Sequence, residues 1–599
     1  MKDALASCVA MLRVGWQQNR RKFIAASVLS IASGLAWPLV ALALSAATSA
    51  ALGRDVRGAT IAGALTGVGV IGVLMLRHFA YTSYVEIADL AVITLEAELI
   101  TLANGSARLD HHERADYADR MDILQRELHS LISGVGALMT VATLAVSLVS
   151  TSVVLAFVNP WLLLLPLAAV PPVLCGQRAT AITERAKERM ATVNRKGWHL
   201  FRLATGAESA KELRVFRLQD EFRRRNRELA AEVGRTLIAA ERRAIAVNAA
   251  GQVFFAVAYL LGVLFVVRQA VTGRGAVGEV VLVITLAAQV NQQVNQTLQE
   301  LRNMQQIVKG FSRLRWLRAL IAAQQPAAAD REMPDRIRDG IELRGVRFVY
   351  PGTTSPVLRD ANVLLSAGST VAIVGENGAG KSTLVKLLCR FYDTTDGAIL
   401  IDGIDIRRLP LDAWRERISA GFQDFVRYEL PARQTVGVGD LPRIDDEQAV
   451  LDALDRAHAG DVMARLDDGL STHLGKSYTE GTNLSGGQWQ KLALGRAMMR
   501  ETPFLLVLDE PTAALDAEAE HHLFDRYAES ARRVGARTGA ITLLVTHRFS
   551  TARSADLILV VDEGRIVEAG GHAELMANDA LYAELYRMQE SAYVDAQRD

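Results

Sequence analysis

Apolar residues gather in long runs over the first half of the chain. A membrane-spanning helix needs ~20 mostly apolar residues, and each of these runs is close to that length. The first run contains Trp37–Pro38, and a membrane helix tolerates such a proline as a kink. The pattern predicts six membrane-spanning helices, at about 23–50, 59–81, 132–157, 160–177, 244–268 and 276–297.

The segments between these runs alternate in length. Those after the first, third and fifth runs are very short, whereas residues 82–131 and 178–243 form long charged connections. Both connections keep the apolar periodicity of helices, so we expect the membrane helices to continue beyond the bilayer as rods. Each connection also contains a break in that periodicity, at 103–121 and 204–222. We expect a short helix at each break, in contact with a cytoplasmic domain.

Basic residues indicate which side of the membrane each segment faces. Arg20, Arg21 and Lys22 precede the first run, and the second long connection is rich in arginine. Because cytoplasmic segments carry an excess of Lys and Arg, the N-terminus, both long connections and the C-terminal half are predicted to be cytoplasmic. No small-residue cleavage site follows a short apolar core, so the first run is interpreted as a retained membrane helix.

The composition agrees with a membrane protein and argues against a nucleic-acid partner. Of the 599 residues, 50% are hydrophobic and 22% are charged, and the mean hydropathy is +0.15. The net charge is only +1, so there is no overall basic field to attract nucleic acid. Cys8, Cys175 and Cys389 are far apart and show neither metal-ligand nor disulfide spacing.

Several polar residues in the first half have two interpretations. Asn248 and Gln252 lie deep in the fifth run and are candidates for lining a substrate cavity. A polar group at the end of the sixth run either lines that cavity or marks where the helix leaves the bilayer. His111–Glu113 lacks the i, i+4 histidine spacing of a zinc helix, so a solvated or interfacial role is favoured. The polar group comprises Asn291, Gln292, Gln293, Asn295 and Gln296.

The chain changes character after residue 321. Residues 322–340 combine Ala, Pro and alternating charges without periodicity, which is typical of a linker. We therefore predict an all-α membrane domain at 1–321, this linker, an α/β domain at 341–590 and a C-terminal tail at 591–599.

A phosphate-binding loop lies near the start of the second domain. The strand-like run 369–375 leads directly into GENGAGKST, residues 375–383, and an apolar helix pattern follows. In such a loop the backbone N–H groups wrap the phosphates, the lysine reaches the β and γ phosphates, and the next hydroxyl binds Mg²⁺. The expected ATP-binding residues here are Gly375, Asn377, Gly378, Gly380, Lys381, Ser382 and Thr383, with Ser382 also a Mg²⁺ ligand.

Two carboxylates end a second buried strand. The run FLLVLDE at 504–510 ends in Asp509, which can hold Mg²⁺, and Glu510, which can orient or deprotonate the attacking water. A strand capped by acids at a turn would explain this pair alone. It would not explain the pair together with the phosphate-binding loop.

With these motifs, almost the whole chain resembles an ABC transporter of the exporter type, in which one membrane half is fused to one nucleotide-binding domain. The segment LSGGQ at 484–488 is similar to the signature motif of that family, which closes over the ATP held by the facing subunit. The resemblance therefore implies why one chain carries two separate phosphate-binding motifs. It also implies that the helix N-terminus at the signature contacts the partner's nucleotide, through Ser485, Gly486, Gly487 and Gln488.

The same resemblance implies further roles at matching positions. Tyr350 matches the aromatic residue that stacks on adenine, and Gln423 matches the glutamine that contacts Mg²⁺. Asp516 matches the loop that crosses the dimer interface, and His547 matches the switch histidine that contacts the γ-phosphate. The expected catalytic residues are Glu510, His547 and Gln423, and the expected Mg²⁺ ligands are Ser382, Gln423 and Asp509.

Every one of these ATP-site motifs is intact, so the expected partner is a second copy of the same chain. The residues around both phosphate motifs look like those of bacterial peptide and lantibiotic exporters. A peptide is therefore the expected cargo, and a bacterial cytoplasmic membrane the expected location. The alternatives are a lipid or drug cargo, or an importer built on the same fold. A soluble chromosome-maintenance ATPase is disfavoured by the six apolar spans.

Overall fold

The protein was analysed as a computed structural model that describes residues 2–106, 108–207, 209–324, 329–510, 535 and 538–596. By their contacts the residues divide into two units, each described separately below. The first comprises Met1–Asn104 and Arg120–Ala319. The second comprises Gly105–Asp119 and Leu320–Asp599, so a short piece of the N-terminal half belongs with the C-terminal half.

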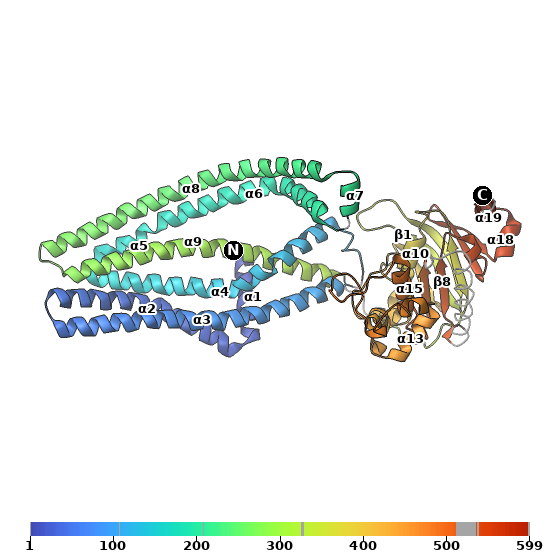
Figure 1. Cartoon of the computed structure of the whole chain (residues 1–599), viewed down its shortest axis with the longest axis horizontal. Helices are drawn as coiled ribbons and strands as arrows, with labels where there is room; N and C mark the ends of the chain where they lie inside the picture. The colour runs from blue at the N-terminus through green and yellow to red at the C-terminus, as the bar shows by residue number, and fades with distance from the viewer. Residues whose placement is uncertain are drawn as a thin grey trace. The chain divides into compact units, whose positions relative to one another are not determined.

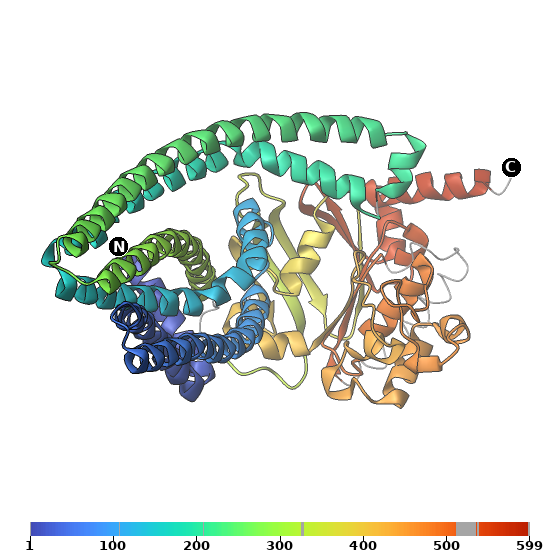
Figure 2. The same cartoon turned by 60° about the vertical axis from the view of Figure 1, so that its left-hand side comes forward.

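The first unit is built from long helices (Figure 1). Long helices pack as pairs: α2 lies along α3, and α6 lies along α8 (Figure 2). The N-terminal helix α1 precedes the first apolar helix and ends at Gln18. The helices are α1 Lys2–Gln18, α2 Arg20–Leu52, α3 Val56–Asn104, α4 Ala115–Val158, the 3₁₀ turn η1 Pro160–Leu163, α5 Leu164–Ala168, α6 Val170–Thr205, α7 Ala210–Val215, α8 Gln219–Val271 and α9 Val277–Ala323.

The six predicted apolar helices are confirmed, each being long and apolar enough to cross a membrane. They are much longer than a bilayer requires. Helix α8 has 53 residues, which corresponds to about 80 Å at 1.5 Å per residue, against ~30 Å of hydrocarbon. The expectation that the membrane helices continue as rods is therefore confirmed.

The two breaks in the long connections differ in structure. At the second break the expected short helix is present as α7, Ala210–Val215. At the first break the expectation is wrong, because residues 109–113 form turns before α4 begins at Ala115. The turns close through backbone bonds from the His112 N–H to the Leu109 oxygen and from the Arg114 N–H to the His111 oxygen.

Polar side chains bond to one another inside the first unit. Gln289 and Gln293 on α9 both donate to the hydroxyl of Ser147 on α4, at 3.0 and 2.7 Å. Gln252 on α8 donates to the amide oxygen of Asn295 at 3.1 Å. Gln293 is thus buried against another helix. Gln289 and Ser147 were not singled out from the sequence.

The second unit contains two sheets and surrounding helices. The smaller sheet is antiparallel, in the order β2-β1-β4-β5. The larger sheet has the order β10-β9-β3-β8-β7-β6, and its neighbours are parallel except for β10. The strands are β1 Gly340–Phe348, β2 Leu358–Ser366, β3 Thr370–Val374, β4 Asp396–Ile401, β5 Ile404–Asp405, β6 Ile418–Gly421, β7 Leu505–Asp509, β8 Ile541–Val545, β9 Leu557–Asp562 and β10 Arg565–Gly570.

Helices surround the larger sheet and cover its apolar strands. Every residue of β3, β7 and β8 is buried, which is the pattern of a parallel sheet covered on both faces. The helices and 3₁₀ turns described are α10 Lys381–Leu388, η2 Ile406–Arg408, α11 Leu411–Glu416, α12 Ala432–Gly437, η3 Leu441–Arg443, α13 Glu447–Arg456, α14 Gly460–Met463, η4 Gly469–Ser471, α15 Gly486–Ala497, α17 Phe549–Ala552, α18 His572–Asn578 and α19 Leu581–Ala596.

The element boundaries can be compared with the predicted domain boundaries. Helix α9 ends at Ala323 and β1 begins at Gly340, on either side of the predicted linker. Helix α19 continues to Ala596, so the predicted start of a C-terminal tail at 591 falls inside a helix.

Candidate functional site

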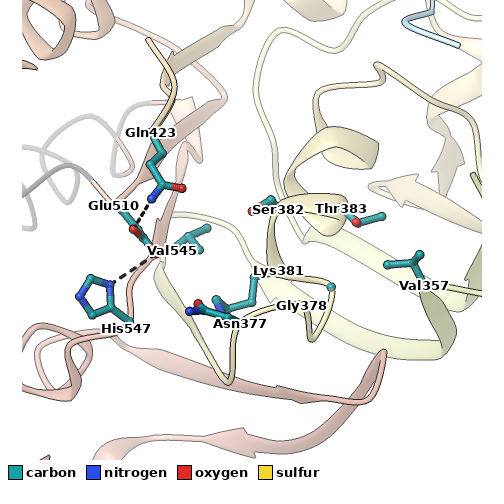
Figure 3. Close-up of a pocket in the computed structure, with 11 residues that line it drawn as sticks. Val357, Asn377, Gly378, Lys381, Ser382, Thr383, Gln423, Glu510, Val545 and His547 are labelled. Carbon is teal, nitrogen blue, oxygen red and sulfur yellow. Dashed lines mark hydrogen bonds and ion pairs between the residues drawn. The ribbon is translucent and has the colours of Figure 1, made fainter. Parts of the chain in front are cut away.

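The carboxyl ends of the parallel strands meet at one cavity of about 660 Å³ in the second unit. The loop after β3 carries the phosphate-binding motif, β7 ends at Asp509, and residues just beyond β6 and β8 complete the wall. This edge is where ligands bind in open α/β sheets, because the loops diverge there. Figure 3 shows the lining residues, which are Val357, Asn377, Gly378, Gly380, Lys381, Ser382, Thr383, Gln423, Glu510, Val545 and His547.

The phosphate-binding loop depends on glycine for its shape. Gly375 has φ +144°, and a Cβ at this position would lie 2.1 Å from the carbonyl oxygen of Val561. Gly380 has φ +113° and is the residue directly before α10. Only glycine adopts such backbone angles without strain. The loop therefore brings its backbone and the N-terminus of α10 to the cavity, where N–H groups favour an anion.

Lys381 is held against its own loop. Its Nζ donates to the carbonyl oxygens of Gly375 and Glu376, both at 2.8 Å. Burial lowers the pKa of Lys381, and the carboxylates of Glu510 and Asp509 oppose that shift. The ammonium group of Lys381 thus lies in the cavity wall, and the nearby carboxylates affect its pKa.

Asp509 is a buried carboxyl next to the cavity, with 8% of its surface exposed. Burial raises its pKa to about 6, with further contributions from Glu510 and Asp424, while Lys381 acts in the opposite direction. Ser382 and Gln423 line the adjacent cavity, and their oxygens together with the Asp509 carboxylate are the type of donor that Mg²⁺ prefers. The residues present therefore fit Mg²⁺.

Glu510 is fixed between two other side chains that the sequence singled out. Gln423 Nε2 donates to Glu510 Oε2 at 2.6 Å, and His547 Nδ1 lies 3.4 Å from Glu510 Oε1 (Figure 3). Glu510 has φ +47°, a strained value for a residue with a side chain. Its backbone N–H donates to the carbonyl oxygen of Val545 at 2.9 Å, which ties the strained residue to the end of β8.

Tyr350 lies beside the phosphate-binding helix. Its hydroxyl is 3.1 Å from Thr383 Oγ1, and its ring packs edge-on against Phe348 and Tyr392. Lys386 Nζ lies 5.4 Å from the centre of the same ring. Tyr350 is not among the cavity-lining residues, but it contacts one of them.

The signature segment forms the start of α15. Ser485 is its N-cap, and the Ser485 hydroxyl and the Gln488 side chain make a reciprocal capping box. None of residues 484–488, all of which the structure describes, lines the cavity. Gln490, one turn later, donates to the backbone oxygen of Glu510 at 3.3 Å. Asp516 lies outside the described residues.

Within the second unit, the segment 105–119 packs against the C-terminal part of the chain beside Tyr350. Tyr392 donates from its hydroxyl to Glu113 Oε1 at 2.5 Å, and Lys386 Nζ lies 3.7 Å from the same oxygen. The backbone N–H of Leu109 donates to the oxygen of Phe391 at 3.1 Å. The expectation that the first break contacts a cytoplasmic domain is therefore confirmed. Because the Tyr392 ring packs on Tyr350, the contact adjoins the nucleotide-binding region.

Some residues around the site carry no sequence motif. Val357 and Val545 line the cavity, and Gln589 of α19 bonds to the backbone beside His547. Valines at strand ends and a helical glutamine give no signal in a single sequence. Their roles arise from contacts between segments that are distant in the chain.

Comparison with protein families matches both halves of the chain. Residues 358–513 match the family described as ABC transporter, and residues 23–294 match the ABC transporter transmembrane region. A solved structure titled "Structure of a bacterial Atm1-family ABC exporter with ATP bound" superposes with a TM-score of 0.76. It covers 95% of this chain and 99% of that chain at 23% identity, which establishes a shared fold.

Curated relatives carry the name ATP-dependent lipid A-core flippase. The Alcanivorax borkumensis protein is 32% identical over 429 residues, which is 71% of this chain and 70% of the relative. The Salmonella typhimurium protein is 37% identical over 284 residues, or 47% of each chain. The Xylella fastidiosa protein is 35% identical over 343 residues, and the match spans 57% of this chain and 56% of the relative. The match thus spans about half the length of the last two relatives.

Both the membrane helices and the ATP site are accounted for by these matches. The chain belongs to the ABC transporter family, as a multi-pass membrane protein of the exporter type whose transmembrane region is fused to an ATP-hydrolysing domain.

Proposed function

We propose that this chain, acting as a dimer of identical copies, uses ATP to export a lipid across the cytoplasmic membrane of a bacterium. The cargo class is inferred from the name that the relatives share, which is ATP-dependent lipid A-core flippase. The peptide cargo expected from the sequence finds no support among them. A lipid cargo, the alternative to a peptide, fits the names of these relatives better.

The cavity is proposed to hold the phosphates of ATP. Positive-φ glycines bring backbone N–H groups to the cavity at the start of α10, and Lys381 is in reach of an anion there. Ser382, Gln423 and Asp509 would hold Mg²⁺, which when bound supplies positive charge to the phosphates. Tyr350 is proposed to stack on the adenine, beside Thr383 and Lys386.

Glu510 is proposed to orient and deprotonate the attacking water. The amide of Gln423 holds one carboxylate oxygen at 2.6 Å, so the other oxygen faces His547. His547 is proposed to contact the γ-phosphate from this position. In phosphoryl transfer most of the catalysis comes from such positioning and from charge, because the protein does little covalent chemistry.

The signature segment is proposed to serve the partner's nucleotide. In one copy, residues 484–488 do not line the cavity, although they present a capped helix N-terminus suited to an anion. A second copy would bring its own signature to this cavity. ATP would then hold two copies together, and hydrolysis would release them, as in other ligand-dependent switches.

The cargo can be tested with purified protein in lipid nanodiscs of defined composition. The rate of ATP hydrolysis is measured with added glycosylated, phosphorylated lipids, simple phospholipids, linear and modified peptides, and cationic drugs. A lipid export activity predicts stimulation by one lipid class, and movement of that lipid between leaflets in proteoliposomes. The Glu510→Gln variant should abolish both. Stimulation of ATP hydrolysis by peptides alone would contradict the lipid proposal and support peptide export.

A further inference from the structure

The turn that carries His547 is held by the C-terminal helix α19. The backbone N–H of Phe549 donates to Gln589 Oε1 at 2.7 Å, and Gln589 Nε2 donates to the backbone oxygen of His547 at 3.1 Å. The side-chain amide of Gln589 thus accepts from the backbone N–H on one side of Arg548 and donates to the backbone oxygen on the other side. Gln589 therefore bonds to this segment as a residue of a neighbouring parallel strand would, by accepting from one backbone N–H and donating to one backbone oxygen.

Helix α19 is itself firmly placed. Tyr582 is fully buried, and its hydroxyl lies 2.8 Å from His572 Nδ1 of α18. Its backbone N–H donates to Glu568 at 2.9 Å. The rings of Tyr582 and Tyr586 lie 5.5 and 6.5 Å from the ring of Phe549. Positions 582, 586 and 589 lie on one face of a helix, so the packing of the two tyrosines brings Gln589 onto the turn.

The turn itself is a short extended segment that leads into a short helix. Residue Arg548 is extended, with φ −101° and ψ 113°, and its N–H donates to Thr546 Oγ1 at 3.0 Å. Helix α17, which follows, has only 4 residues. The His547 side chain reaches 3.4 Å from Glu510, a contact that depends on where the turn places its backbone. In catalysis a misplacement of about 1 Å can lower a rate ~100-fold.

We propose that Gln589 is a positioning residue for ATP hydrolysis. It acts through the backbone of His547 and Phe549 to hold the His547 imidazole beside Glu510. The proposal rests on the proposed role of His547, and it assigns to the C-terminal helix a part in the hydrolytic step. Gln589 touches neither the cavity nor, by this proposal, the nucleotide.

The test replaces Gln589 by methionine, which has a similar length and cannot make either hydrogen bond. Full-length protein in nanodiscs is assayed for kcat and KM with ATP and for its thermal unfolding midpoint. The matched control is Glu590→Gln, an exposed position next to it on the same helix. We expect Gln589→Met to lower kcat about 5- to 20-fold with KM changed less than about twofold, and the control to do neither.

A double variant separates positioning from general destabilisation. If Gln589 acts through His547, Gln589→Met should cost nothing further in the His547→Ala background, because both changes remove one interaction. The proposal would be overturned if Gln589→Met lowered kcat by the same factor in the parent and in the His547→Ala background. A normal kcat in Gln589→Met would also overturn it, as would a fall in kcat that accompanies a lowered unfolding midpoint. A normal rate in His547→Ala would refute the role of His547 itself. A slow His547→Ala beside a normal Gln589→Met would refute only the role of Gln589.

Discussion

Gln423 and Glu510 lie 87 positions apart in the chain and are joined by a hydrogen bond of 2.6 Å between Nε2 and Oε2. The bond fixes one oxygen of the carboxylate, and the positive φ of Glu510 fixes its backbone. A carboxylate held in this way is already oriented before ATP arrives, so in its proposed role as base it would need little reorganisation during the reaction.

Replacing this proposed base should stop hydrolysis without preventing ATP binding. We expect Glu510→Gln to lower the rate of ATP hydrolysis by about 100-fold or more, because the amide cannot accept a proton from water. Its affinity for ATP, measured by fluorescent-nucleotide titration, should stay within about threefold of the parent.

The matched control for this experiment is Glu563→Gln. Glu563 also has a positive φ, of 43°, but it does not line the cavity. Loss of hydrolysis in both variants would mean that a glutamate at positive φ supports the fold in general. Normal hydrolysis in Glu510→Gln would remove Glu510 from the catalytic role.

The proposed sharing of sites between copies can be tested by mixing two inactive variants. Lys381→Ala removes the lysine that is proposed to bind phosphate. Gly486→Glu places a negative charge at the signature, where an added Cβ meets no atom within 4 Å, so the helix should still fold. In a mixed dimer, one site would carry both defects and the other would carry neither. An equal mixture should therefore recover about a quarter of the parent rate of hydrolysis.

The alternative arrangement gives a different result. If each copy used its own signature, every site in the mixture would carry one defect, and no activity would return. Each variant alone and a mixture of two Lys381→Ala preparations serve as controls, and all of these should be inactive.

The buried carboxyl of Asp509 should weaken the nucleotide-free protein. Its pKa is raised from 3.8 to about 6. Between these values the unfolded chain loses its proton while the folded chain keeps it, so stability falls as the pH rises through this window. We expect Asp509→Asn to raise the unfolding midpoint by about 2–5 °C at about pH 7.5, and by less at about pH 5. The exposed Glu416→Gln should change neither, and a lower midpoint for Asp509→Asn would contradict the argument.

The contact between Tyr392 and Glu113 should hold the segment 105–119 in place. Burial and the neighbouring carboxylate raise the pKa of Tyr392, so its hydroxyl stays protonated and donates. Removing it in Tyr392→Phe should cost about 1 kcal/mol, because the Glu113 side chain is partly exposed. We expect hydrogen exchange at the Leu109 amide to become about fivefold faster. Tyr428→Phe is the control, and unchanged exchange at Leu109 would show that the hydroxyl contributes nothing there.

Much of the architecture could be predicted from the sequence because its causes are local. A helix in lipid must be apolar along its length, so six runs of apolar residues were enough to locate six helices. The phosphate-binding loop needs glycine at Gly375 and Gly380 for steric reasons, which leaves a recognisable pattern. The two carboxylates Asp509 and Glu510 likewise lie at the end of a buried strand.

Other features depend on contacts that a single sequence does not reveal. Residues 109–113 form turns, where a helix was expected, and their backbone bonds to Phe391 nearly three hundred positions away. The hold of Gln589 on the His547 turn depends on how α19 packs against Phe549. The residues that suggested a peptide cargo belong to the ATP-hydrolysing domain, whereas the lipid alternative is supported by the names of the relatives.

The length of α8 also has a torsional consequence. It is a single helix of 53 residues, from the charged connection to the far end of an apolar span, and it contains no proline. Each residue added to such a helix rotates everything beyond it by about 100°, whereas seven residues leave a net rotation of only about 20°. The rotational positions of its two ends about the helix axis are therefore fixed relative to each other. Insertions of seven residues near Arg235 should be tolerated. Insertions of one to six residues should be disruptive, because they would turn the face of α8 that packs on α6.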